Sequence, residues 1–576
     1  MLFRQASCTI LLFVFFAQQL LAQDISQRIK SPSTYFQQRL EAIELYNSGQ
    51  WEESKVVLKD ILEQYQKDPD LYYLMGISMY ETGNYQEAID HFSNCLDLGG
   101  PSLLGTQVNS DPLNDVMVKI AQAYAKLGDK DNTIVWLKIA FAARYDEKPF
   151  LLGSPEFEAF SGDKVFLELF GVSSRENMSR TEAWEADLSY FERRVEQINY
   201  TFNMGTDRTK FTESVAQVKA SISSLTDEEL IVEIMKIVGN LGNGHNFIIP
   251  TTPTIGALKK LPIQLYQFSD GMIIVDANDD YNEWIGYEVE SIGGMTIEEV
   301  LLRSNEVNSR DNDMQTLWLG PYYITLPDVL KGLGVIDNAD KVNLSLKDSI
   351  GNTVELEIAP EAWNFTGFPK LPKLRGDQQP LFLSRMDEVY WSTLLPVHQA
   401  IYVQFNAVAE KEDQSLELFC EEWYTLSQEN KVKSLILDLR HNQGGNGSLL
   451  PTMHQAVRKF VTMTPNGRVF VLAGRETFSA AQNLLTKLTE YANPIIVGEP
   501  SGSRPNHIGE AGWVRLPNSG LMAIISTQFH QTSRAEDQRK WIAPHMPVSL
   551  SSEDYFSGND PALEEIKKLI QVLDEK

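Results

Sequence analysis

The sequence predicts a multidomain protein in which an all-α array of helical repeats precedes an α+β region that ends in an α/β core. Three observations support this prediction. Apolar residues recur at helical spacing up to about residue 250, short β-rich runs follow from about residue 260, and strands alternate with helices from about residue 400. Apolar strands that alternate with helices indicate a mostly parallel sheet covered on both faces. The 576 residues leave room for about three or four domains.

The N-terminal helical region has the spacing of tetratricopeptide repeats. Gly49 and Gly83 are separated by the period of about 34 residues that this repeat has, and the small Gly76 lies among aromatic residues. A third, degenerate copy follows around Tyr124. One repeat cannot bury its apolar face alone, so we expect a stack of about three units over residues 34–170. Such arrays usually bind proteins or peptides; an unrelated helical bundle is the alternative.

Residues 1–22 have the pattern of a secretory signal peptide. Arg4 precedes an apolar run that ends at Phe16, and the small Ala22 stands before polar residues. This run is shorter than the roughly 20 apolar residues of a membrane-spanning helix, which disfavours the alternative of a membrane anchor. No later stretch is long and apolar enough to span a bilayer. We therefore expect an exported protein that is soluble after signal cleavage.

Charge and cysteine content exclude several classes of protein. The net charge of −28 argues against nucleic-acid binding, which requires a basic surface. After signal cleavage only Cys95 and Cys420 remain, and they fall in different predicted domains, so we expect no disulfide. The sequence has no cysteine pairs, no HExxH motif and no P-loop, so it predicts neither a metal nor a cofactor.

Two strand ends in the C-terminal region carry residues suited to nucleophilic catalysis. One strand leads to Gly444 and Gly445, and the next leads to Ser479 at the start of a helix. A helix N-terminus offers unpaired backbone N–H groups and a partial positive charge, which favour a developing oxyanion. The pattern predicts Ser479 as nucleophile, with the N–H of Ala480 and that of Gly444 or Gly445 as the oxyanion hole. An ordinary N-cap serine is the alternative.

These segments, with the C-terminal stretch WIAPHMPVSL, resemble the S41 peptidases, the tail-specific and tricorn-core-like serine peptidases, over about residues 181–570. The resemblance implies a helical part at 181–250, a PDZ-like module at 258–375 and an α/β catalytic core of the ClpP/crotonase type at 385–576. The stretch GYEVESIGGMTIEEVLL, a strand, a two-glycine turn and a helix, is what suggests the PDZ-like module.

The resemblance also bears on the base that activates the serine. Many S41 relatives use a lysine about 25 residues after the serine, but that loop here contains Arg504, which stays charged and cannot accept a proton. The tricorn-like branch instead takes a histidine from the upstream helical part. His245 in LGNGHNF matches that position, and a surface-loop histidine is the alternative reading. His507 is the reserve candidate for the base.

A third, acidic residue should orient the imidazole. In the tricorn-like branch it lies shortly before the stretch WIAP, where Asp537 fits and Glu536 is the second candidate. The sequence departs from the family at His545, where an aspartate is usual. Asp438 is also acidic, but an aspartate next to Arg440 at a strand end is expected to pair with it structurally.

The sequence thus favours an exported serine endopeptidase that acts on proteins or peptides. Two alternatives remain: a non-catalytic peptide- or ligand-binding protein of the same fold, and an interaction scaffold in which the repeats dominate. A glycan on Asn446, which stands in a glycosylation motif, would fill the predicted oxyanion hole, so a bacterial periplasmic or secreted protein is expected.

Overall fold

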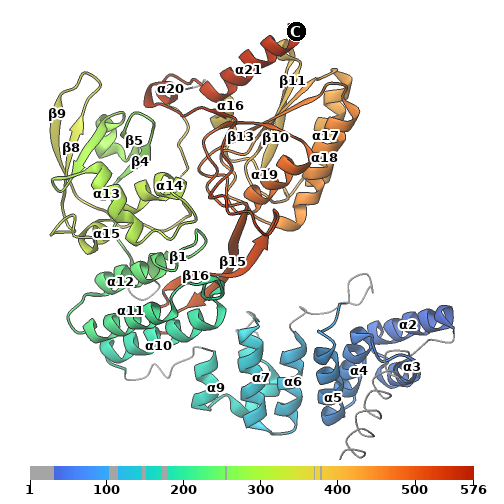
Figure 1. Ribbon diagram of the computed structural model, residues 1–576. Coiled ribbons are helices and arrows are strands. Elements are labelled where there is room, and N and C mark those ends of the chain that lie inside the picture. Colours follow the sequence, from blue (N-terminus) through green and yellow to red (C-terminus); the bar gives the residue numbers. More distant parts are fainter. Residues whose placement is uncertain are drawn as a thin grey trace, which may run out of the picture. The chain divides into compact units, whose positions relative to one another are not determined.

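The computed structural model describes residues 31–102, 115–143, 145, 151–170, 178–252, 256–368, 370–376 and 379–575. The chain divides into two compact units, one ending at Ser174 and the other beginning at Arg175 (Figure 1). The predicted signal peptide at residues 1–22 lies outside the described residues. Within the described part, no helix is both long and apolar enough to cross a membrane.

The first unit is helical, as predicted. Its elements are α2 (Pro32–Asn47), α3 (Trp51–Gln64), α4 (Pro69–Glu81), α5 (Tyr85–Asp97), α6 (Asp115–Lys126), α7 (Lys130–Ala142), η1 (Pro155–Phe160) and α9 (Lys164–Leu169). Gly76 on α4 shows why a small residue is needed, since a Cβ there would lie 2.5 Å from the Phe92 ring of α5. Gly83, with a φ of 81°, supplies the left-handed turn between these two helices.

The second unit opens with helices and a short sheet region. The elements are α10 (Arg180–Ile198), η2 (Tyr200–Met204), α11 (Arg208–Ser221), α12 (Asp227–Gly239), β1 (Phe247–Ile249), β2 (Thr251–Thr252) and β3 (Gly256–Ala257). Thr226 starts α12 with a capping box. The Thr226 hydroxyl accepts from the N–H of Glu229, and the Glu229 carboxylate accepts from the N–H of Thr226. His245 lies in the loop between α12 and β1.

A mainly antiparallel sheet follows, in the order β4-β5-β6-β8-β9, with β7 paired to β6. Its elements are β4 (Ile263–Gln267), β5 (Met272–Ala277), η3 (Asp279–Trp284), β6 (Glu288–Ile292), β7 (Met295–Thr296), α13 (Ile297–Arg303), η4 (Ser304–Glu306), α14 (Met314–Tyr323), α15 (Pro327–Gly332), β8 (Val342–Lys347) and β9 (Thr353–Ile358). Gly293 and Gly294 form the predicted turn with φ values of 61° and 82°.

The C-terminal core is a six-stranded sheet in the order β10-β11-β12-β13-β14-β17. Its strands are β10 (Tyr390–Leu395), β11 (Ala400–Phe405), β12 (Ser434–Asp438), β13 (Arg468–Ala473), β14 (Ile495–Gly498) and β17 (Met546–Pro547). The β10–β11 pair is antiparallel and all other pairs are parallel, which agrees with the prediction of a mostly parallel sheet.

Helices cover both faces of this sheet (Figure 1). Helices α17 (Leu416–Glu429), α18 (Leu450–Met463) and α19 (Ala480–Tyr491) pack on one face and α21 (Pro561–Asp574) on the other. The shorter helices are α16 (Leu381–Ser384), η5 (Pro396–His398), η6 (Gly447–Leu449) and α20 (Ser552–Phe556), and Tyr555 of α20 packs against β5. Along β11, Ile401 and Val403 face the cluster that contains α17, α18 and α19, while Tyr402 faces α21. Because β11 to β14 are parallel, their carboxyl ends lie along one edge of the sheet.

One hairpin departs from the prediction. β15 (Asn506–Arg515), for which no strand was predicted, pairs with β16 (Met522–Gln531). β16 also pairs with β1, so this three-stranded sheet joins the C-terminal core to the helical part (Figure 1). Gly509 and Gly512 interrupt the apolar alternation of β15, so its strand character comes from pairing rather than from local sequence.

Candidate active site

Ser479 lies at a sharp turn between β13 and α19. Its φ of 52° and ψ of −122° are unusual for a residue with a Cβ, and such strain persists only where the surroundings impose it. Its side chain makes no cap hydrogen bond to the helix, so the ordinary role of an N-cap serine is not filled. A strained serine between a strand and a helix is the arrangement of a nucleophile elbow.

Hydrogen bonds made by the neighbouring residues fix this turn. Thr477 Oγ1 donates to the carbonyl of Leu439 at 2.9 Å and accepts from the N–H of Gly474 at 3.0 Å. The N–H of Phe478 donates to the carbonyl of Asn442 at 3.1 Å. The serine turn is therefore held against the loop that follows β12, which carries the two predicted glycines.

Gly444 lies directly against Ser479. With a φ of 104°, a Cβ at this position would be 2.7 Å from Ser479 Cβ and 2.9 Å from the nitrogen of Ala480. Gly445 is equally restricted, since its φ is 134° and a Cβ would lie 2.3 Å from the carbonyl oxygen of Val408. Both positions require glycine because any side chain would collide with the backbone or the serine.

The hydrogen bonds distinguish the predicted oxyanion donors. The N–H of Gly444 is already occupied, since it donates to Asn442 Oδ1 at 3.0 Å. By contrast, the N–H groups of Gly445 and Ala480 donate to no other group within the described part of the chain. Gly445 and Ala480 therefore remain as the two N–H groups able to hold an oxyanion beside Ser479.

The structure brings His245 to the same place. Its ring stacks on that of Phe478, the residue before Ser479, with ring centroids 4.2 Å apart. Its backbone N–H donates to Asn243 Oδ1 at 3.0 Å, which fixes the loop after α12. Both ring nitrogens are buried and neither has a hydrogen-bond partner among the described residues, so no hydrogen bond joins His245 to Ser479.

Burial lowers the pKa of His245 well below its ordinary value, and the nearby His507 and His530 lower it further. A contact with the backbone of Ile508 opposes this shift in part. The imidazole is consequently neutral at physiological pH, which is the form that can accept a proton.

His507 and His530 extend the stack of rings. His507 on β15 lies parallel to His245 at 5.3 Å, and His530 lies opposite it on β16 at 5.3 Å. His507 Nδ1 is 3.2 Å from the carbonyl oxygen of Arg504, and burial lowers the pKa of His507 to about 4. No group of three or more histidine, cysteine or acidic residues in the described ranges could hold a metal ion.

The structure does not bring the predicted acid Asp537 to this stack. Its carboxylate is bound by Arg539 at 2.6 and 2.9 Å, and hydrogen bonds from Arg539 and Ser533 hold the pKa of Asp537 far below its usual range. Glu536 is exposed. Neither carboxylate has a contact with His245 or His507 in the part of the chain that the structure describes.

Sequence reasoning missed Asp311, which lies in an irregular segment before α14. Its Oδ1 accepts from the N–H of Gly244 at 3.1 Å and its Oδ2 accepts from Ser503 Oγ at 2.6 Å. Its charge favours the protonated form of His507. No sequence signal marks it, because the motif RDND belongs to no catalytic pattern and is far from both histidines in the chain.

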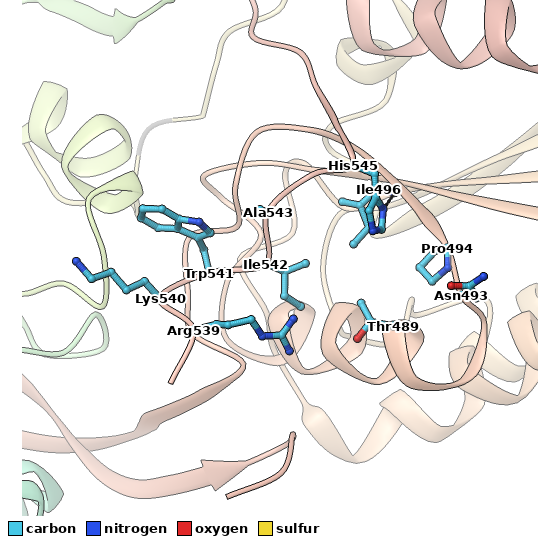
Figure 2. Close-up of a pocket in the computed structure, with 10 residues that line it drawn as sticks. All are labelled: Thr489, Asn493, Pro494, Ile496, Arg539, Lys540, Trp541, Ile542, Ala543 and His545. Atoms are coloured by element: carbon cyan, nitrogen blue, oxygen red, sulfur yellow. Dashed lines mark hydrogen bonds between the residues drawn. The ribbon is translucent and has the colours of Figure 1, made fainter. Parts of the chain in front are cut away.

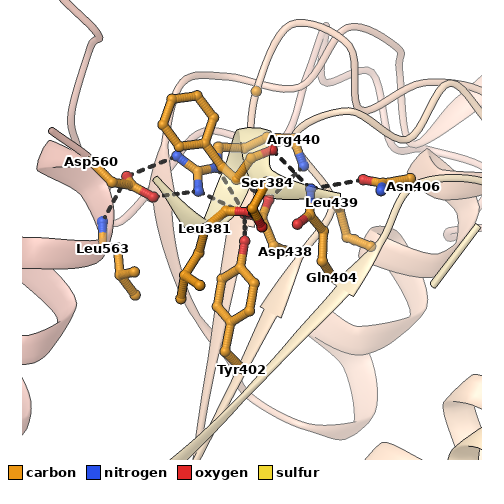
Figure 3. Close-up of polar contacts among 12 residues, drawn as sticks. Leu381, Ser384, Tyr402, Gln404, Asn406, Asp438, Leu439, Arg440, Asp560 and Leu563 are labelled. Atoms are coloured by element: carbon orange, nitrogen blue, oxygen red, sulfur yellow. Dashed lines mark hydrogen bonds and ion pairs between the residues drawn. The ribbon is translucent and has the colours of Figure 1, made fainter. Parts of the chain in front are cut away.

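Asp438 has the structural role that the sequence indicated. Arg440 bonds Asp438 at 2.6 Å and Asp560 at 2.8 Å, and Tyr402 donates to Asp438 at 2.6 Å (Figure 3). This buried network ties the end of β12 to the start of α21. Asp438 is therefore committed to its ion pair and to the fold.

A buried acid–base pair lies beside the serine turn. His441 Nδ1 is 4.0 Å from a carboxylate oxygen of Glu476, and Gln443 donates to the other oxygen at 3.0 Å. Burial lowers the pKa of His441 to about 4 and raises that of Glu476 to about 7. The Gln443–Glu476 bond links the glycine loop to the serine turn.

A separate pocket of about 500 Å³ lies at the C-terminal end of α19 (Figure 2). Its lining includes Thr489, Arg539, Trp541 and His545. His545, the departure from the family pattern, accepts a hydrogen bond on Nδ1 from the N–H of Ile496 at 3.0 Å. Ser479 stands at the other end of α19, so this pocket is distinct from the candidate active site.

Two family models match the chain. The one described as peptidase family S41 matches residues 399–548, and one described as a tetratricopeptide repeat matches residues 70–98. The chain thus contains a peptidase S41 domain and a tetratricopeptide repeat, as the sequence predicted. No curated protein matches it.

Solved structures give further similarities. Mature CPAF complexed with lactacystin is 14% identical, with 69% of this chain and 99% of that chain covered and a TM-score of 0.49. The photosystem II D1 C-terminal processing protease is 13% identical, with 67% and 99% covered and a TM-score of 0.32. The tricorn protease is 12% identical, with 68% and 37% covered and a TM-score of 0.31.

Proposed function

Because the chain carries a domain of the serine-type peptidase family S41, we propose that it is an endopeptidase that hydrolyses peptide bonds of proteins or peptides. One observation carries the proposal. Ser479 is held with a positive φ at a helix start, Gly444 lies against it, and His245 stacks on the preceding Phe478. A serine hydroxyl, an imidazole and free N–H donors so arranged support the proposal of a nucleophile, a base and an oxyanion hole.

In the proposed reaction Ser479 Oγ attacks the carbonyl carbon of the scissile peptide while His245 takes the hydroxyl proton. The oxygen that becomes negatively charged is held by the N–H groups of Gly445 and Ala480 and by the positive end of α19. The C–N bond then breaks, His245 returns the proton to the leaving amine, and water hydrolyses the acyl-enzyme. His245 has to come within hydrogen-bond reach of Ser479 when substrate binds, as catalytic groups often do.

The test is labelling with a fluorophosphonate probe together with hydrolysis of an unstructured protein. Ser479→Ala should abolish both, and Ser349→Ala, which removes an exposed hydroxyl from the β8–β9 loop, should leave both unchanged. Turnover by purified Ser479→Ala at the wild-type rate would refute the proposal.

A second candidate function is a non-catalytic peptide- or ligand-binding protein. It is favoured by the lack of any hydrogen bond from His245 to Ser479. It predicts that the wild-type protein binds an unstructured peptide, gives no labelling and produces no cleavage. The tetratricopeptide repeats would serve protein partners in either case.

We further propose export to the periplasm or beyond, supported by the apolar run behind Arg4. The sheet with β6, its glycine turn and α13 supports a PDZ-like module, and the β11–β14 core with its flanking helices supports a ClpP/crotonase-type domain.

A further inference from the structure

Asp311, whose side chain is buried, is bonded to the loops that carry His245 and His507. One carboxylate oxygen accepts from the N–H of Gly244, the residue before His245, at 3.1 Å. The other accepts from Ser503 Oγ at 2.6 Å. Ser503 precedes Arg504, whose carbonyl oxygen contacts His507 Nδ1. A single carboxylate therefore ties together the two loops that position His245 and His507.

The backbone around Asp311 strengthens this connection. Its N–H donates to Gln315 Oε1 at 2.6 Å, and Gln315 Nε2 donates to the carbonyl of Gly244 at 3.4 Å. Its carbonyl accepts from Arg504 Nε at 3.1 Å. Gly244 has no room for a side chain here, since a Cβ would lie 2.3 Å from Gln315 Oε1. The loop before His245 thus has one position relative to the segment that contains Asp311.

We propose that Asp311 is the acidic positioning residue of this site, which holds the His245 loop in place and provides the negative charge that balances a protonated imidazole. This rests on the proposed peptidase function. When His245 takes the proton from Ser479, a positive charge forms in the stack that His245 shares with His507, whose protonated form the Asp311 charge favours.

The other charged groups around the stack are less suited to this role. Glu510 on β15 is 3.9 Å from His530, but its side chain is 63% exposed, so water screens its charge. Asp537 is engaged with Arg539. Arg504 is positively charged and would oppose an imidazolium, and His530 has no negative charge to offer. Asp311 is the buried carboxylate whose bonds lead directly to the loops of both histidines.

Asp311→Asn tests the inference because it keeps the size and the acceptor for Gly244 and removes the charge. We expect kcat to fall about 10–100-fold with little change in KM, as for other residues that orient a catalytic group. In a plot of kcat/KM against pH, activity falls at low pH where the imidazole becomes protonated, and this fall is the acid limb. In Asp311→Asn the acid limb should move to lower pH, because loss of a nearby negative charge lowers an imidazole pKa. Asp340→Asn, at an exposed ion pair with Lys259, is the matched control and should match wild type.

The measurements also distinguish a purely structural role of Asp311, a role of Asp537 in its place, and failure of the proposed function. A purely structural role predicts that Asp311→Asn lowers Tm while the acid limb stays in place. A large loss in Asp537→Asn, with Asp311→Asn near wild type, would overturn the inference and favour Asp537. If Ser479→Ala stays active, the proposed function fails; if it is inactive while Asp311→Asn equals wild type, only this inference fails.

Ser503→Ala is the second variant, for the case that Asp311→Asn does not fold. It removes one of the two hydrogen bonds to the carboxylate and leaves the charge in place. We expect a several-fold loss in kcat with a folded protein. Wild-type kcat and an unmoved acid limb in Ser503→Ala would then overturn the inference.

Discussion

The ring of His245 stacks on Phe478 with centroids 4.2 Å apart, and Phe478 is joined by a peptide bond to Ser479. An aromatic contact between the candidate base and the residue next to the candidate nucleophile holds the two close without a hydrogen bond between them. We expect His245→Gln to lower kcat/KM by roughly 10²–10⁴-fold, the contribution of a positioned general base. The measurement is steady-state hydrolysis of one unstructured substrate across pH. Near-normal activity with a limb at pH 8 or above would assign the base to a lysine instead.

The backbone strain at Ser479 gives a prediction for stability. Glycine adopts a positive φ without cost, whereas alanine keeps the strain. Ser479→Gly should therefore be more stable to urea than Ser479→Ala by about 1 kcal/mol, after allowance for the larger unfolded-state entropy of glycine. Both variants should be inactive. Equal unfolding free energies would show that the turn is not strained.

Gly444→Ala should disrupt the site, because the added Cβ would lie 2.7 Å from Ser479 Cβ in a backbone conformation that alanine disfavours. We expect kcat to fall by about 10²–10³-fold, comparable to loss of an oxyanion donor. Gly447→Ala, where nothing lies within 4 Å, is the control and should keep wild-type kinetics. Equal activity of the two variants would contradict the close approach of the glycine loop.

Acid should destabilise the folded protein through its buried histidines. The pKa values of His245, His441 and His507 are all lowered in the folded state, the last two to about 4, while an unfolded histidine titrates near 6.5. Below about pH 6.5 the unfolded chain therefore binds more protons, so the unfolding free energy falls as pH drops from about 6.5 towards 4. Urea unfolding at a series of pH values measures this.

One variant separates the contribution of a histidine to this pH dependence from that of the carboxylates. His441→Gln should reduce the slope between pH 6.5 and 4, since one buried imidazole no longer takes up a proton on unfolding. An unchanged slope in this variant would mean that His441 titrates normally in the folded protein.

The Arg440 network should be costly to break. Arg440→Met leaves the buried carboxylates of Asp438 and Asp560 without their cation, and we expect a loss of about 3–5 kcal/mol in unfolding free energy. Arg468→Met, at a more exposed pair with Asp574, should cost about 1 kcal/mol or less. Similar losses in both variants would contradict a special role for the buried network.

The parts of the fold with a strong local pattern were predictable. Strands β12 and β13 and helix α19 have apolar periods that a single segment reveals, and they carry Gly444, Gly445 and Ser479. The hairpin of β15 and β16 was not, because its strand character depends on partners remote in sequence, one of them β1.

The candidate site likewise has residues that the sequence predicted and residues that it did not. Ser479, the glycines and His245 belong to motifs, and the structure brings them together. Asp311 contacts the site only through tertiary hydrogen bonds. The carboxylate of Asp537 is instead bound by Arg539, two residues later. Such contacts depend on how distant segments of the chain meet, and no local sequence pattern reveals this.

The pairing of β16 with β1 affects when the chain can first cleave anything. The loop of His245 is made early in synthesis, the serine turn much later, and the hairpin that carries His507 and His530 later still. Contacts between segments so far apart form late in folding. An incomplete nascent chain therefore lacks the assembled candidate nucleophile and base. On the proposed mechanism, the protein can cleave peptides only once its own chain is fully folded and no longer an extended substrate.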